Sequence, residues 1–75
     1  MNEFFIQIEV QENASGVRGV IPLVFDDYNQ ALAKHYTVLS VAATGDLPYH
    51  ASFVIASNGV VMQQMVFDRR TAPTE

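Results

Sequence analysis

Hydrophobic and polar residues alternate along the first segment of the chain. Between Glu3 and Gln11, the even positions Phe4, Ile6, Ile8 and Val10 are apolar, whereas Gln7, Glu9 and Gln11 are polar. A period of two over nine residues is typical of a strand with one buried side, so we expect the Ile6 and Ile8 side to face the core. Phe5 is the exception, an aromatic residue on the polar side.

Residues 12–16, Glu-Asn-Ala-Ser-Gly, are turn formers and predict a chain reversal. A second strand is then expected over residues 17–25. Its odd positions suit the core, which places Val17, Ile21, Leu23 and Phe25 there. Pro22 has no amide hydrogen to donate within a sheet, so it argues for an edge strand or a bulge.

A helix is expected from Tyr28, because Asp26 and Asp27 come directly before it and can cap its first amide groups. The spacing of apolar residues predicts a buried stripe of Tyr28, Leu32, Leu39 and Ala43, with Ala31, Tyr36 and Ala42 beside it. Residues 44–48, Thr-Gly-Asp-Leu-Pro, end the helix, with Gly45 as its C-terminal cap.

Asn58-Gly59 separates two apolar segments, 49–57 and 60–69, and predicts a hairpin. Two registers remain open. A two-residue turn places Met62 across from Ile55 and Val66 across from Ala51, whereas a three-residue turn with a glycine bulge brings Val61, Met65 and Phe67 onto the side of Phe53 and Ile55.

The order of these elements predicts an α+β fold, β-β-α-β-β, in which one helix packs on one face of a four-stranded antiparallel sheet. A chain of 75 residues has room for one domain, which we place at residues 1–70. Residues 71–75 are expected to form a disordered tail.

One helix covers one face of such a sheet, and the other face then carries too many apolar residues to remain exposed to solvent. Charged residues make up 16% of the chain, below the roughly 25% that is usual. We therefore predict a homodimer, formed by stacking of these faces or by pairing of edge strands, over a monomer that tolerates scattered surface valines. The interface candidates are Phe5, Val20, Val24, Val54, Met65 and Phe67.

The charge balance disfavours nucleic acid as a partner, because 4 basic and 8 acidic residues give a net charge of −4. No apolar segment is long enough for a membrane span, and the cytoplasm is the expected location. Without cysteine or a zinc-binding histidine spacing, we expect no metal and no cofactor.

Four residues offer an alternative function, a small-molecule site or a minor enzyme in a cleft near His35, Tyr36, Tyr49 and His50. Residues of these kinds are more often structural. No serine lies in a nucleophile elbow, and capping of the helix accounts for both aspartates, so the chain is expected to be no enzyme.

Three segments carry a resemblance: Phe4-Phe5-Ile6-Gln7-Ile8, then Phe25-Asp26 followed by Gln30-Ala31-Leu32-Ala33, and the hairpin from Val54 to Val61. In these segments the chain resembles a group of short proteins of unknown function from gut bacteria and their phages. The resemblance implies an origin in a phage or mobile element and assigns no catalytic residue. With it, we expect a non-enzymatic protein that acts through contacts with itself and with a host protein.

Overall fold

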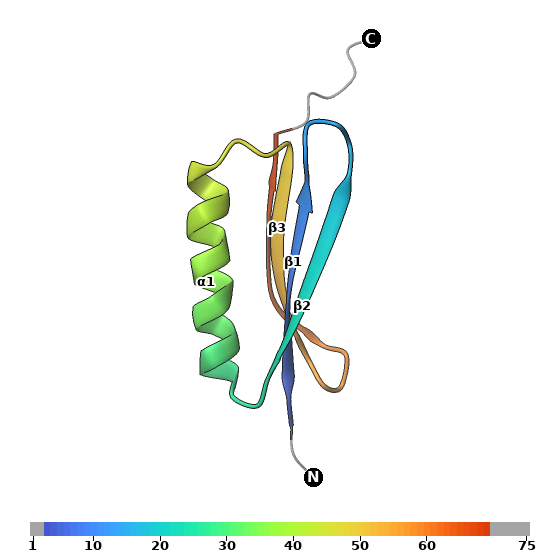
Figure 1. Ribbon diagram of the computed structural model, residues 1–75. Coiled ribbons are helices and arrows are strands. Elements are labelled where there is room, and N and C mark those ends of the chain that lie inside the picture. The colour runs from blue at the N-terminus through green and yellow to red at the C-terminus, as the bar shows by residue number, and fades with distance from the viewer. Residues whose placement is uncertain (1–2, 70–75) are drawn as a thin grey trace.

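The computed structural model describes residues 3–69, which form one antiparallel sheet and one helix (Figure 1). The strand order is β2-β1-β3-β4, and the helix lies along one face of the sheet. The predicted α+β fold is therefore confirmed. The elements are β1 (Phe5–Glu12), β2 (Arg18–Phe25), α1 (Tyr28–Thr44), β3 (Tyr49–Ala56) and β4 (Val61–Asp68). The tail predicted at 71–75 lies outside the described residues.

The turn between β1 and β2 is organised by the Asn13 side chain. Its Oδ1 atom accepts hydrogen bonds from the backbone amides of Ser15 and Val17, both at 3.0 Å. Gly16 completes the turn with a φ of +86°, a left-handed conformation that favours glycine. β2 is an edge strand with Pro22 opposite Ile8, so the edge position predicted from the proline is confirmed.

Helix α1 begins as predicted, because the Asp27 carboxylate accepts a hydrogen bond from the amide of Asn29 at 3.1 Å. Gly45 is the C-terminal cap in an extended conformation. A Cβ atom there would lie 3.0 Å from the carbonyl oxygen of Val41, so close packing accounts for this glycine. The predicted buried stripe was correct only in part: the buried residues are Ala31, His35, Val38 and Ala42, of which Ala31 and Ala42 were expected beside the stripe, and Ala43 is exposed.

The hairpin of β3 and β4 combines both predicted registers. The amide of Ala56 bonds the carbonyl of Val60, and Gly59 takes a φ of +89°, as a three-residue turn requires. Ile55 then pairs with Val61, but a bulge follows and Met62 is an extra residue. Beyond the bulge, Ala51 pairs with Val66, as the two-residue turn predicted.

The prediction of which sheet face the helix covers was wrong for β1. The covered face carries Gln7 of β1 together with Ser52 and Val54 of β3, all of them fully buried. Ile6 and Ile8 point to the other side, which we call the open face. Alternation determines which residues of a strand share a face, but not which face the helix covers. The helix packs on the polar face, because its buried His35 has the polar partner Ser52 there.

The interface candidates consequently divide between the two faces. Val20 and Val24 pair with Val10 and Ile6, so they lie on the open face as expected. The remaining four share the covered face instead, as the pairing of the strands shows: Phe5, Val54, Met65 and Phe67.

Candidate functional sites

A polar layer lies between the helix and the sheet. The Ser52 hydroxyl oxygen of β3 lies 2.7 Å from Gln7 Nε2 of β1 and 2.7 Å from His35 Nδ1 of α1. Ser52 is 0% exposed and His35 is 2% exposed. Hydrogen bonds therefore hold the three elements together where most domains of this class have apolar packing.

Ser52 is the shared partner in this layer. Gln7 Nε2 donates to the Ser52 oxygen, and the direction of the bond between Ser52 and His35 Nδ1 depends on the tautomer of the His35 ring. Burial lowers the pKa of His35, which agrees with the neutral form. Gln7 Oε1 has no hydrogen-bond partner among the described residues, so this interior carries a desolvation cost.

A second polar pair, on the same face, links β1 and β3. His50 Nε2 donates to Glu9 Oε2 at 2.6 Å, and Gln11 Nε2 donates to the same oxygen at 2.6 Å. Burial opposes ionisation of Glu9, but the bonds from His50 and Gln11 and the positive charges of His50 and Lys34 outweigh it, so the pKa of Glu9 is lowered.

The four residues of the predicted cleft do not line one cleft in this structure. His35 is buried in the polar layer and His50 is buried beside Glu9, whereas Tyr36 is 57% exposed on the helix. Tyr49 pairs with Glu12 of β1 on the open face. Ser52 and His35 have the hydrogen bond of a nucleophile and its base, but neither is accessible to a substrate from solvent.

The described part of the chain also contains no group of three or more histidine or acidic side chains placed to hold a metal ion. Nor does any helix within residues 3–69 have the length and apolar character for crossing a bilayer.

The open face is apolar across all four strands. Strand pairing arranges it in rows, each with one residue from β2, β1, β3 and β4 in that order. Three successive rows contain a single polar side chain, Gln64, and no charged one. They are Val20-Val10-Ala51-Val66, Pro22-Ile8-Phe53-Gln64 and Val24-Ile6-Ile55-Val61.

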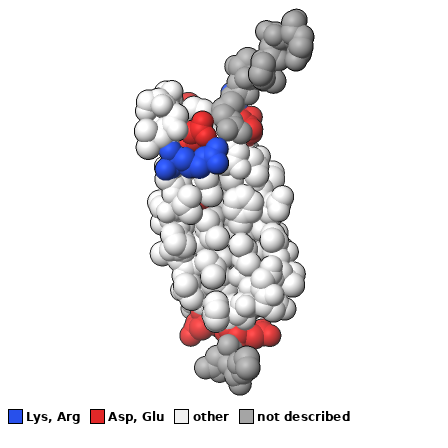
Figure 2. All heavy atoms as spheres, turned by 90° about the vertical axis from the view of Figure 1, so that its right-hand side faces the viewer, with Lys and Arg blue, Asp and Glu red and all other residues white. Residues whose placement is uncertain are grey.

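Charged side chains gather at the two ends of this face, as the space-filling view shows (Figure 2). By the strand pairing, the row at one end is Arg18-Glu12-Tyr49-Asp68. Arg18 bonds Glu12 at 2.8 Å and its guanidinium lies 5.1 Å from the centre of the Tyr49 ring. The face thus has an apolar centre and a polar rim, which is the usual anatomy of a protein interface.

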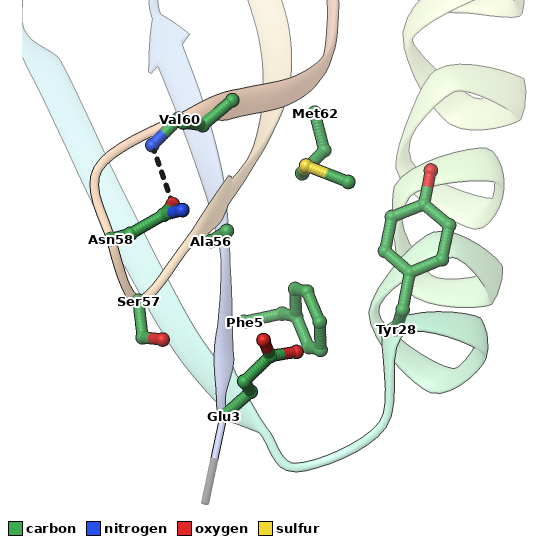
Figure 3. Close-up of a pocket in the computed structure, with 8 residues that line it drawn as sticks. All are labelled: Glu3, Phe5, Tyr28, Ala56, Ser57, Asn58, Val60 and Met62. Carbon is green, nitrogen blue, oxygen red and sulfur yellow. Dashed lines mark hydrogen bonds between the residues drawn. The ribbon is translucent and has the colours of Figure 1, made fainter.

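A pocket of about 400 Å³ lies at the other end of the molecule, between the first turn of α1, the start of β1 and the β3–β4 hairpin (Figure 3). Its lining is mostly apolar. It consists of Glu3, Phe5, Tyr28, Ala56, Ser57, Asn58, Val60 and Met62.

Comparison of the chain with protein-family models, with curated proteins and with solved structures gives no match. The resemblance to short proteins of gut bacteria and phages therefore stays a prediction.

Proposed function

We propose that this protein is a non-enzymatic protein-binding module whose open sheet face docks against a second copy of the same chain. The main support for this proposal is the composition of the open face, in which three consecutive rows across four strands contain no charged side chain. A patch of this kind on so small a domain marks an interaction site.

The size of the face reaches the lower limit for a specific dimer interface. Four strands of eight residues give a face of about 26 by 19 Å, from a rise of about 3.3 Å per residue and a strand spacing of about 4.8 Å. Stacking of two such faces buries on the order of 1,000 Å² in total, which is the lower bound for a specific interface. Corrugation by side chains adds to this area.

The charges at the rim favour a second copy as the partner. A two-fold axis parallel to the strands, midway between β1 and β3, reverses the strand order of the partner, so β2 lies over β4. Arg18 of each copy then faces Asp68 of the other. Opposite charges meet twice, and the one polar side chain of the apolar rows, Gln64, lies at an edge that water reaches.

Bulky side chains meet at the centre of this arrangement, where Ile8 of each copy faces Phe53 of the other. Stacked sheets require such interdigitation to reach the packing density of a protein interior.

The direct test is the mass in solution, measured by light scattering on a sizing column over a wide concentration range. We expect twice the monomer mass for the wild-type chain and a monomer for Val20→Glu. Val41→Glu is the matched control, because Val20 is 57% exposed on the open face and Val41 is 58% exposed on the helix.

A monomeric wild-type chain would overturn the proposal, and so would a Val20→Glu variant with an unchanged dimer mass. A host protein captured on the open face of a monomeric chain would mean that a different partner covers it.

A further inference from the structure

We propose that the pocket between α1, β1 and the β3–β4 hairpin binds a small organic cation, namely a primary amine attached to an aromatic body. Phe5 of the lining lies on the covered face and Tyr28 belongs to the helix, so this side of the pocket stays accessible when a second copy covers the open face (Figure 3). The inference is therefore independent of the proposed self-association.

The bulge in β4 builds one wall of this pocket. Ile55 pairs with Val61 and Val54 pairs with Gln63, which leaves Met62 as the extra residue. Its side chain points toward Tyr28 of the helix (Figure 3). Bulges commonly redirect a side chain beside a binding site, and methionine adapts its shape to an aromatic ligand.

Two aromatic rings form the opposite side. Phe5 and Tyr28 meet edge to face, with ring centres 5.4 Å apart at an angle of 61°. Gln63 Nε2 donates to the Tyr28 hydroxyl oxygen at 3.0 Å, and this bond fixes the position of the phenol ring. The hydroxyl proton of Tyr28 is then left to donate to a ligand. Aromatic rings held in this way offer both apolar contact and a negative ring face to a cation.

The charge of the pocket selects the sign of the ligand. Glu3 is the one charged residue of the lining, and its carboxylate lies beside the Phe5 ring (Figure 3). No lysine or arginine lines the pocket, so an anion would be repelled by Glu3 and would have no cation to pair with. An ammonium group can reach the carboxylate while the aromatic body fills the apolar part.

The volume sets the size of the ligand. About 400 Å³ lies in the lower part of the range of ligand pockets, about 300 to 1,000 Å³. One aromatic ring with a short amine-bearing chain fits within it, and phenethylamine is a suitable probe.

The experiment compares phenethylamine with 3-phenylpropionate and 2-phenylethanol, which have a similar body and a negative or no charge. Binding is followed by amide chemical shifts in NMR titrations. We expect saturable shifts clustered at Phe5, Tyr28 and Met62, and an affinity for the amine about tenfold above that for the carboxylate.

Glu3→Gln is expected to remove this preference while leaving the weak binding of the alcohol unchanged. Asp46→Asn is the matched control, since it deletes one exposed carboxylate at the other end of α1. Equal affinities for amine and carboxylate would overturn the proposal, as would shifts spread outside the pocket or a Glu3→Gln variant that keeps the preference. None of these results depends on the mass in solution.

Discussion

Ser52 Oγ lies 2.7 Å from His35 Nδ1, and this bond joins the middle of the helix to the middle of the sheet. The buried apolar residues between α1 and the sheet are small, namely Ala31, Val38, Ala42 and Val54. Small side chains bury little area, so polar contacts carry an unusual share of the packing between α1 and the sheet. Directional bonds also fix where the helix lies on the sheet.

Ser52→Ala should lower the free energy of unfolding by about 1–3 kcal/mol, because it leaves the Gln7 amide and His35 Nδ1 buried without their partner. Urea denaturation measures this change. Ser57→Ala is the control, since Ser57 is exposed in the hairpin turn and its side chain should contribute little. Equal stability of the two variants would show that the polar layer adds nothing to the fold.

Acidification should destabilise the protein in two steps. Folding lowers the pKa of His35 below 6.5, so the unfolded chain binds this proton more readily and stability falls as the pH drops below about 6.5. Folding also lowers the pKa of Glu9 below 4.5. The stability that its carboxylate provides is present above pH 4.5 and is lost as the pH falls through the folded pKa.

Urea midpoints measured between pH 3 and pH 8, roughly the range over which both groups titrate, check this prediction. In His35→Gln, the loss of stability below pH 6.5 should be absent while the loss at the Glu9 titration remains. In Glu9→Gln, the loss at the Glu9 titration should be absent while the loss below pH 6.5 remains. A wild-type chain with constant stability from neutral pH down to the Glu9 step would contradict the role assigned to His35.

The order of elements was predictable because each one has local signals. Asp27 caps the helix, Asn58-Gly59 forms the hairpin turn, and Pro22 lies in an edge strand, as expected. Each of these features depends on residues that are neighbours in the sequence, so a local sequence pattern is enough to predict it.

The covered face of the sheet was not predictable from alternation, because both faces of β1 are equally regular. A matching signal did exist: Gln7, Ser52 and His35 are polar residues at interior positions of three separate elements. Each one looks like an isolated polar residue until the strand pairing brings them together. The hairpin bulge was not predicted for a related reason, since the turn signal at Gly59 specifies the register only near the turn, and the pairing of β3 with β4 changes register at Met62.

Arg69→Ala should destabilise the end of the helix. The last turn of α1 contains no basic residue, and the Arg69 guanidinium supplies the positive charge from the end of β4. It donates to the carbonyl oxygens of Ala42 at 2.6 Å, Ala43 at 3.2 Å and Leu47 at 3.2 Å.

We expect a loss of about 1–2 kcal/mol, from the hydrogen bonds and the interaction with the helix dipole. Amide hydrogen exchange should accelerate first in residues 40–45. Arg69→Lys should lose less than Arg69→Ala, because it keeps the charge without the planar fork. Unchanged exchange in Arg69→Ala would rule out this capping role.

The proposed orientation of the dimer predicts selective pairing between two charge-reversed variants. In Arg18→Asp, each copy places an aspartate over the partner's Asp68, and in Asp68→Arg, each copy places an arginine over the partner's Arg18. Two like-charge contacts should weaken each homodimer by on the order of tenfold. When the two variants are mixed, both rim contacts join opposite charges again.

Native mass spectrometry of the mixture should therefore show the heterodimer in excess of the statistical half that random exchange gives. A mixture of the wild-type chain with a tagged wild-type chain is the control and should stay statistical. Statistical pairing of the variants, with Val20→Glu still monomeric, would mean that the open faces stack around a different axis. A two-fold axis perpendicular to the strands would place β2 over β2, so Arg18 of one copy would lie far from Asp68 of the other. Selective pairing of the two variants therefore distinguishes this axis from one parallel to the strands.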